Sequence, residues 1–348
     1  MSSSPAPDVP GHAATPPPDI PAAIHAYARD WSWLPGVQAF YRVNDVELGE
    51  MVACFFPGRR DGFPVEVPAW ADLAATQPEA YAALCAEVRG RRGWDPDMSV
   101  LGALHLEFIA HDADRLKLTG EWLHSLHRLG PERRALHIMD FGCGASSYAE
   151  LALNLWPSIR ATLVDVDPSV VEYLRFRYSR YGERVRCVAP PATVRLTKRA
   201  RVDVDHRVLG DRYDAMVMSD VLEHTLDPLA ILIHMVRQLN PGGLMFINYP
   251  HYIEGDWHTP EAFHMRAWCF RYVRRVCRPG GTYSWFRNGS GRPGLPCLAL
   301  EMLHPLILWK SRRFARAYFR EHGQALVEQV AVRARRQVTV EELLASVG

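Results

Sequence analysis

The sequence predicts an α/β protein with a largely parallel β-sheet, and three observations lead to this prediction. Short apolar, β-branched segments alternate with segments whose apolar residues recur every three or four positions. Acidic residues or glycines directly follow several of the apolar segments. The chain of 348 residues is long enough for about two domains. We therefore expect a parallel sheet with helices on both faces, joined to further helical segments.

The chain before the predicted sheet is expected to be mostly helical. Residues 1–21 contain seven prolines and are predicted to form a disordered leader. Residues 22–130 carry apolar residues at helical spacing, most clearly in 79–93 and 99–130, and Gly130-Pro131 ends this region. The prediction is a helical cap, or substrate region, over residues 22–130.

The predicted core covers residues 131–262 and alternates strand with helix. The expected strands are 135–141, 161–167, 184–189, 214–219 and 244–249. The expected helices are 146–156, 168–182 and 227–240. Residues 190–212 are too long for an ordinary connection and are expected to form an insertion or a hairpin.

The strongest local signal is a turn in which an apolar strand ends in Asp140 and passes through Gly142 and Gly144 into a helix. Glycine allows a close approach that a Cβ would block, and the first amides of a helix can donate to a ligand. Ser147 stands where a dinucleotide fingerprint requires its third glycine. Residues 137–159 contain no Lys or Arg, which suits a cationic or hydroxylated ligand better than a pyrophosphate. A purely structural turn is the alternative for this motif taken alone.

A second acidic residue favours the same site. Asp165 lies at the end of the second predicted strand, 21 residues after Gly144. Open parallel sheets bind ligands at the carboxyl ends of their strands, and a carboxylate there can accept from both hydroxyls of a ribose. Taken alone, Asp165 also fits an acidic residue near a helix N-cap.

Four blocks in order resemble the class I S-adenosylmethionine-dependent methyltransferases, in particular small-molecule members with a VLEH motif. The blocks are the turn at 140–144, the segment Val164–Pro168, the segment Tyr213–His224, which ends in Val-Leu-Glu-His, and the turn Leu239–Leu244. The resemblance covers roughly residues 135–250. It implies a Rossmann-like core with a mostly parallel seven-stranded sheet, and S-adenosyl-L-methionine as the cofactor.

The resemblance also implies which residues bind that cofactor: Asp140, Gly142, Gly144, Asp165, Val166, Ser219 and Asp220. Asp140 would reach the amino group of the methionine moiety, directly or through water, and Asp165 would bind the ribose hydroxyls. Ser219 and Asp220 would form the floor of the site beside the sulfonium.

Two features depart from the family pattern. Ser146 stands where many members have a third glycine. No acidic residue clearly matches the one that contacts adenine after the third strand, so Asp203, Asp205 and a backbone amide stay open as substitutes.

The segment 249–264 follows the fifth predicted strand and is expected to overhang the cofactor, because it leaves the carboxyl edge of the sheet. His258 resembles a histidine common at this place in small-molecule members and is the first candidate for a general base, followed by His224 and His251. A structural hydrogen bond is the alternative for each. The segment lacks tight metal-ligand spacing, so no metal site is predicted. Its aromatic residues suit either an acceptor pocket or the packing of a lid.

The charge is distributed unevenly along the chain. The formal net charge is +1, which argues against polyanion binding by the whole chain. Residues 266–337 nevertheless carry 15 basic and 3 acidic residues. The predicted extension 263–348 is therefore basic and helical, and it is a candidate to complete the sheet and the acceptor pocket. Three roles are open for its charge: a solvated face, a docking face for an acidic partner such as a carrier protein or a phosphorylated substrate, or association with a membrane surface.

Several features bear on location and excluded partners. No apolar run reaches about 18 residues, so no transmembrane segment is expected. The first residues lack the pattern of a secretory signal, and seven cysteines without a CxxC pair fit a cytoplasmic protein. No nucleic-acid-binding module is visible, so nucleic acid is not an expected partner.

The leading functional expectation is transfer of a methyl group from S-adenosylmethionine to a small-molecule acceptor, at oxygen, nitrogen or carbon, in a biosynthetic pathway such as specialised metabolism. Amino-group methylases of nucleic acids and glutamine carry an (Asp/Asn)-Pro-Pro-(Tyr/Phe) block after the fourth strand. This chain has Ser219-Asp220-Val221-Leu222 there, so it is not expected to belong to that class. Transfer or cyclisation of the aminocarboxypropyl group on the same fold is one alternative. A non-catalytic cofactor-binding scaffold that docks an acidic partner is another.

Overall fold

The computed structural model describes residues 18–92, 100–194, 202–204, 209–253, 258–288, 295–334 and 339. Most of the predicted leader lies outside these residues, as do Asp205 and the segment 254–257. The backbone of Asp203 is described, but its side chain is not. The proposed substitutes for an adenine-binding acid therefore stay predictions.

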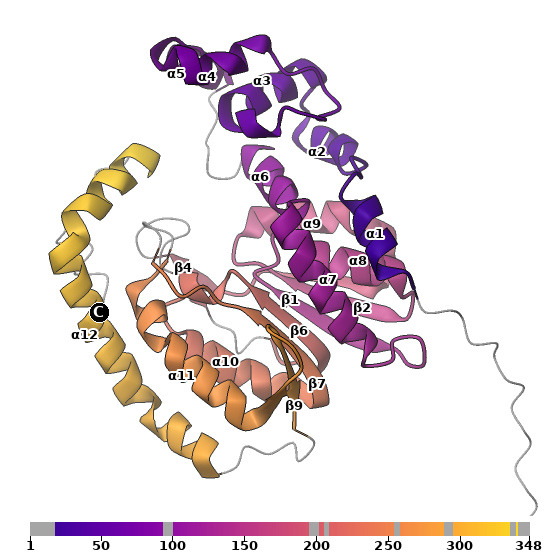
Figure 1. The fold of residues 1–348 in the computed structure, drawn as a ribbon, viewed down its shortest axis with the longest axis vertical. Helices are drawn as coiled ribbons and strands as arrows, with labels where there is room; N and C mark the ends of the chain where they lie inside the picture. Colours follow the sequence, from indigo (N-terminus) through magenta and orange to yellow (C-terminus); the bar gives the residue numbers. More distant parts are fainter. Residues whose placement is uncertain are drawn as a thin grey trace, which may run out of the picture.

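Seven strands form one sheet in the order β3-β2-β1-β6-β7-β9-β8 (Figure 1). The five parallel strands are β1 (Leu136–Phe141), β2 (Ile159–Val164), β3 (Val185–Val188), β6 (Tyr213–Ser219) and β7 (Leu239–Asn248). β9 (Ser284–Arg287) runs antiparallel to β7, and β8 (Cys277–Pro279) runs antiparallel to β9. The predicted Rossmann-like, mostly parallel sheet of seven strands is confirmed. Its last two strands lie within the segment 263–348.

Helices cover both faces of the sheet, which explains why its strands are apolar throughout. α1 (Ile20–Tyr27), α7 (Ala113–His127) and α8 (Ser147–Leu155) pack together on one face. α10 (Pro228–Gln238) and α11 (Pro260–Val276) cover the other (Figure 1). Ile138 of β1 packs into the core beneath α1, α7 and α8, and its neighbour Met139 packs into the core beneath α10 and α11. Successive side chains of a strand point to opposite faces of the sheet. α9 (Pro168–Arg177) connects β2 to β3 and contacts β3.

Several boundaries differ from the predicted ones. The helical stretch 99–130 divides into α6 (Val100–Ala110) and α7, because Asp112 adopts an extended conformation and caps α7 by accepting from the amide of Asp114 at 3.0 Å. The predicted helix 168–182 becomes α9 and a 3-10 helix at Ser179–Arg184. The segment 190–212 contains the antiparallel strands β4 (Ala192–Val194) and β5 (Val202–Val204), which confirms the hairpin alternative.

The N-terminal helices form a cap with its own core. The cap comprises α2 (Leu34–Tyr41), α3 (Asp45–Phe55), α4 (Leu73–Thr76), α5 (Pro78–Arg92) and two short 3-10 helices, Pro57–Arg59 and Ala69–Asp72, together with α6. Leu48, Met51 and Leu104 are fully buried in this core, and Tyr173 of α9 packs into it. The cap is thereby attached to the sheet domain through α9.

A buried ionic cluster strengthens this attachment. The Arg177 guanidinium on α9 lies 2.7 Å from Glu107 of α6 and 2.6 Å from Glu150 of α8. The hydroxyl of Tyr27 donates to Glu150 at 2.9 Å, and that of Tyr173 donates to Glu107 at 2.5 Å. One cation thus holds together helices of the cap and of the core.

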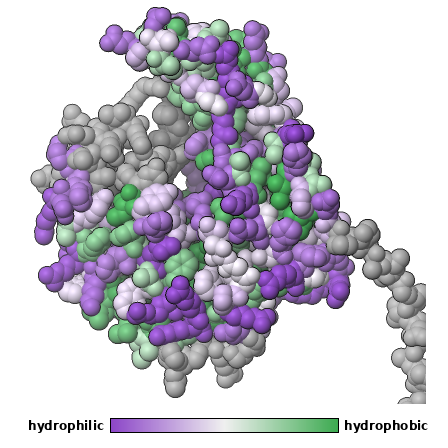
Figure 2. All heavy atoms as spheres, in the orientation of Figure 1, coloured by the Kyte–Doolittle hydropathy of each residue, from purple (hydrophilic) through white to green (hydrophobic). Residues whose placement is uncertain are grey.

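The C-terminal helix α12 (Leu295–Ala334) packs along the outer side of α11 (Figure 1). Its inner side chains, among them Leu300, Ile307 and Phe319, are buried. Its surface exposes the apolar side chains Leu298, Met302, Leu303, Leu306 and Trp309, and the basic residues of the helix follow them from Lys310 onward. Hydrophilic residues cover most of the visible face of the molecule, with hydrophobic residues scattered among them (Figure 2). Within the described residues, no helix combines the length and the apolarity needed to cross a membrane.

Candidate active site

A pocket of about 360 Å³ opens at the carboxyl ends of β1, β2 and β6. The strand order reverses between β1 and β6, which is where open α/β sheets bind ligands. Six of the seven predicted cofactor residues line it: Gly142, Gly144, Asp165, Val166, Ser219 and Asp220. The cap closes the other side with residues of α2 and α6, including Tyr41, Leu106 and Ile109. The seventh predicted residue, Asp140, lies beneath the pocket rather than in its wall, with 3% of its surface exposed.

The turn after β1 needs glycine at two positions. Gly142 has φ +70°, and an added Cβ would lie 2.2 Å from Cγ2 of Val221. Gly144 has φ +50°, and its Cβ would lie 3.0 Å from Cδ2 of Leu106. Both residues therefore combine a left-handed backbone with a close approach by a neighbouring side chain.

Ser146 explains how this turn works without the third glycine of the family pattern. Its φ is +57° and its ψ is +58°, a left-handed conformation that favours glycine. The Ser146 hydroxyl donates to Asp140 at 2.6 Å and also accepts from the amide of Ala149 as the N-cap of α8. We infer that these side-chain hydrogen bonds offset the cost of the unfavourable backbone conformation.

Asp140 is a buried carboxylate at the end of β1. Burial raises its pKa to about 7, although the hydrogen bond from Ser146 and the charge of Arg115 lower it. In the unfolded chain its pKa returns to the ordinary value of 3.8. Between these two values the folded state binds a proton that the unfolded state does not, so raising the pH through this range weakens folding.

Asp140→Asn is therefore expected to unfold at a higher temperature than the wild type at pH 8, because it removes a buried charge. The difference should shrink as the pH falls toward 5, where Asp140 of the folded wild type is protonated. Thermal unfolding followed by circular dichroism at both pH values measures this.

Asp214→Asn provides a control with the opposite sign. Burial raises the pKa of Asp214, but hydrogen bonds from the His137 amide and from Arg134 lower it further, so that its net shift is downward. Its charge therefore stabilises the fold at pH 8, and Asp214→Asn should lower the unfolding temperature there. A lower unfolding temperature for Asp140→Asn than for wild type at pH 8 would contradict the proposed cost of the buried charge.

Asp165 lies in the wall of the pocket, at the position the sequence predicted. Its carboxylate accepts from the amide of Gly144 at 3.3 Å and from the amide of Asp167 at 3.1 Å. Burial raises the pKa of Asp165. The neighbouring Val166 is partly buried against the core and also faces the pocket. An acidic oxygen and an apolar surface thus lie side by side at the end of β2.

Arg115 is a pocket residue that the sequence did not single out. Its guanidinium donates to the Ser219 hydroxyl at 2.8 Å and forms an ion pair with Asp220 at 2.7 Å. Asp220 has φ +54° and also accepts from the side chain of Asn248 at 2.7 Å. Ser219 accepts a further hydrogen bond from the Tyr148 hydroxyl at 3.0 Å. In the sequence, Arg115 is one of several charged residues on an amphipathic helix, and nothing distinguishes it from the others. In the structure, α7 begins after its N-cap Asp112, and Arg115 in its first turn lines the pocket.

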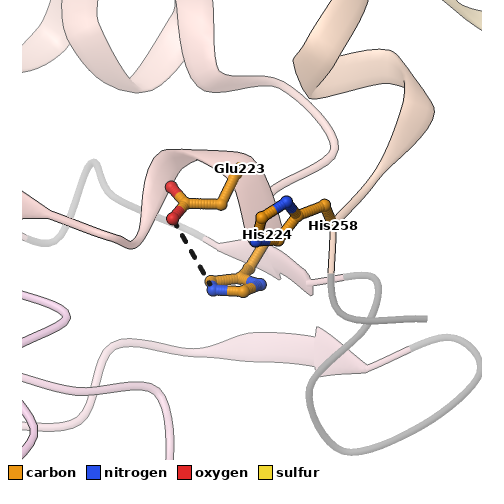
Figure 3. A group of neighbouring side chains, drawn as sticks. All are labelled: Glu223, His224 and His258. Carbon is orange, nitrogen blue, oxygen red and sulfur yellow. Dashed lines mark ion pairs between the residues drawn. The ribbon is translucent and has the colours of Figure 1, made fainter. Parts of the chain in front are cut away.

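The three predicted catalytic histidines occupy different environments. His224 lines the pocket, and its ring centroid lies 5.3 Å from that of His258. Glu223 lies beside them, so that the three side chains form one group (Figure 3). His251 is exposed and contacts the Tyr252 ring, and neither His251 nor His258 is part of the pocket lining. The fold therefore brings His224 and His258 together and leaves His251 apart.

Comparisons with known proteins found similarity to methyltransferases. A family model described as a methyltransferase domain matches residues 113–285, about half of the chain. A malonyl-[acyl-carrier protein] O-methyltransferase from Acetivibrio thermocellus is 24% identical over 124 residues, which are 35% of this chain and 39% of that protein. A ubiquinone biosynthesis O-methyltransferase from Xanthomonas campestris pv. campestris is 24% identical over 224 residues, 60% of this chain and 72% of that protein. An O-methyltransferase family protein from Burkholderia thailandensis aligns over 64% of this chain and 72% of its own, with 17% identity and a TM-score of 0.37.

The sheet order and the glycine turn at its switch point define a Rossmann-like α/β protein. With the family match, the chain belongs to the class I S-adenosylmethionine-dependent methyltransferases, as the four sequence blocks predicted. The match runs from α7 into β9, so the family domain extends beyond the limits 131–262 predicted for the core.

Proposed function

We propose that this protein binds S-adenosylmethionine in the pocket at the carboxyl ends of β1, β2 and β6 and transfers its methyl group to a small-molecule acceptor. The observation that carries the proposal is the convergence of six predicted cofactor residues on one pocket at the switch point of the sheet. These residues come from three separate segments of the chain. Family membership supports the same cofactor.

The charges around the pocket complement the polar groups of this cofactor. The ribose diol would donate to Asp165, and Asp140, which lies beneath the pocket wall, would reach the ammonium of the methionine moiety directly or through water. We assign the carboxylate of the methionine moiety to Arg115, because a guanidinium matches a carboxylate in shape and charge. Ser219 and Asp220, which Arg115 holds in place, would form the floor beside the sulfonium.

The remaining wall suits a small, largely apolar acceptor. Leu106, Ile109 and Ala110 of α6 provide apolar surface opposite the glycine turn, and His224 is the imidazole in the pocket wall on the β6 side. Methyl transfer is an in-line displacement, to which an enzyme contributes mainly by holding the two reactants about 3–3.5 Å apart. Cap and core together enclose the space that such alignment requires.

Calorimetric titration of S-adenosylmethionine into the purified protein tests the proposal. We expect micromolar binding to the wild type and a loss of at least about tenfold, or 1.4 kcal/mol, in Asp165→Asn. The variant keeps the shape of the side chain but loses the charge that strengthens hydrogen bonds from the ribose. Arg115→Gln should lose binding to a similar extent, since the carboxylate at the other end of the cofactor would lack its cation.

Asp211→Asn serves as the control, because Asp211 is exposed, pairs with Arg186 and lies outside the pocket lining. Unchanged binding in both Asp165→Asn and Arg115→Gln would refute the assignment of the pocket. Product analysis then identifies the transferred group. Adenosylhomocysteine indicates methyl transfer, and methylthioadenosine indicates aminocarboxypropyl chemistry.

We also propose that the C-terminal extension binds an acidic partner. α12 exposes apolar side chains, including Met302 and Trp309, next to Lys310 and Arg313. Such a mixture is typical of surfaces that bind an acidic protein or a phosphorylated ligand.

A further inference from the structure

Two histidines and one glutamate form a compact group at the edge of the pocket. Glu223 and His224 belong to the 3-10 helix Leu222–His224, and His258 precedes α11. One potential ligand atom from each residue lies within 4.8 Å of those of the other two (Figure 3). Two separate segments of the chain therefore present a His-His-carboxylate set to the same point.

Hydrogen bonds between the two segments keep this group together. The amide of Thr259, next to His258, donates to the Glu223 carbonyl at 2.7 Å. The Thr259 hydroxyl donates to the Thr225 carbonyl at 2.8 Å. Hydrogen bonds at Thr259 thus fix the backbone next to His258 relative to the segment that contains Glu223 and His224.

The buried carboxylate of Glu223 has an oxygen atom without a hydrogen-bond partner among the described residues. Only 3% of the surface of Glu223 is exposed, and the atom concerned is Oε2. Its other oxygen is 3.9 Å from Nε2 of His224, beyond hydrogen-bond distance. A bound cation would provide both a positive charge and the missing partner.

His258 shows the arrangement that metal-binding imidazoles usually have. Its Nδ1 lies 3.0 Å from the backbone carbonyl of Tyr252. A carbonyl oxygen can only accept, so Nδ1 carries the proton and Nε2 carries the lone pair that a metal ion needs. A backbone carbonyl on the far nitrogen is the common way in which proteins orient such a ligand.

We propose that Glu223, His224 and His258 form a binding site for a divalent transition-metal ion of the zinc type at the edge of the cofactor pocket. Two imidazole nitrogens and one carboxylate oxygen are ligands that such ions accept. Ligand atoms around tetrahedral zinc lie about 3.3 Å apart, given bonds of about 2.0–2.1 Å, so binding would draw the three side chains together. Three protein ligands leave a coordination position open, as in catalytic rather than structural zinc sites.

The position of His224 gives the ion a role that rests on the proposed function. Because His224 lines the pocket, an ion bound to it would lie beside the space proposed for the acceptor. A hydroxyl bound to that ion would lose its proton to solvent more readily, since the metal ion stabilises the resulting oxyanion. The oxyanion then forms a bond to the methyl carbon while the bond from that carbon to sulfur breaks, and its electron pair stays on the sulfur of adenosylhomocysteine. The acceptor class is accordingly an alcohol, phenol or enol rather than an amine.

Zinc binding by the metal-free full-length protein tests the site independently of catalysis. After dialysis against a chelator, titration with ZnCl₂ in competition with a chromogenic chelator should show one ion per chain. His258→Ala and Glu223→Gln should each weaken binding at least about tenfold, the lower end of the range that loss of a ligand or its support produces. His322→Ala, which changes an exposed histidine on α12, should bind like the wild type.

Substitution with Co²⁺ identifies the ligands. The visible spectrum should show the d–d bands of a nitrogen- and oxygen-ligated ion without a thiolate charge-transfer band, and His258→Ala should abolish it. Absence of zinc binding in the wild type, a thiolate band from the cysteines, or equal affinity in wild type and both variants would overturn the site. Circular dichroism verifies that each variant is folded. If Glu223→Gln fails to fold, the zinc affinity of His258→Ala alone tests the site. Because S-adenosylmethionine binding is titrated separately, failure of the metal site is distinguishable from failure of the proposed function.

Discussion

Replacing Arg177 with methionine is expected to lower the free energy of unfolding by about 3–5 kcal/mol, the usual loss when one partner of a buried ion pair is removed. Arg177 is the shared cation between Glu107 and Glu150, and the carboxylate groups of both are buried. Its loss would leave Glu107 without its counter-charge and would leave Glu150 with the half-exposed Arg180. Chemical denaturation at pH 8, followed by circular dichroism, measures the effect.

Arg180→Met is the matched control. Arg180 also pairs with Glu150, but about half of its side chain is exposed, so its removal should cost no more than about 1 kcal/mol. Equal losses in the two variants would show that burial does not determine the strength of this cluster. Addition of Glu107→Gln and Glu150→Gln to Arg177→Met should recover part of the stability, because the uncompensated charges are then gone.

Gly142→Ala is expected to reduce the affinity for S-adenosylmethionine by at least about tenfold and to cost about 1–3 kcal/mol of stability. The added Cβ would overlap Val221, which directly follows Asp220 in the pocket lining. Relief of this overlap must move either the turn after β1 or the segment after β6, and both line the pocket. Calorimetric titration and thermal unfolding of the same preparation separate the two effects.

Gly62→Ala controls for the backbone conformation alone. Gly62 has φ +76°, close to that of Gly142, but an added Cβ would meet nothing within 4 Å. This variant should pay only the cost of a left-handed alanine, about 1–2 kcal/mol, and should bind the cofactor like the wild type. Wild-type affinity in Gly142→Ala would mean that the turn tolerates a Cβ and that its glycine has no role in the pocket.

Local patterns in the sequence were sufficient to predict the sheet and several of the residues that line the pocket. Strands buried on both faces must be apolar throughout, which made β1, β2, β6 and β7 visible as apolar runs. The positions of Gly142 and Asp165 followed because residues at the ends of adjacent parallel strands meet at one edge of a sheet. The break between α6 and α7 was missed because its signal, the N-cap Asp112, lies within a long helical pattern.

Contacts between side chains from distant segments are not visible as a local pattern in the sequence. Arg115 and Asp220 are 105 positions apart, and Glu107 and Arg177 belong to different layers of the molecule. The spacing of residues 249–264 predicted no metal site, because two of the three candidate ligands are adjacent residues of another segment. One side of the pocket is likewise formed by α6, whose apolar residues resemble ordinary packing residues in the sequence.

The sequence by itself determined the type of sheet, its glycine turn and the acidic residue that follows β2, since each depends on a few neighbouring residues and the geometry of a strand or turn. Only the tertiary structure decided that Arg115 enters the pocket, that Arg177 joins cap to core and that His258 meets Glu223 and His224. The physical reason is that these contacts depend on how helices and loops pack against the sheet. Packing directions are set by the whole buried core rather than by the residues that make the contact.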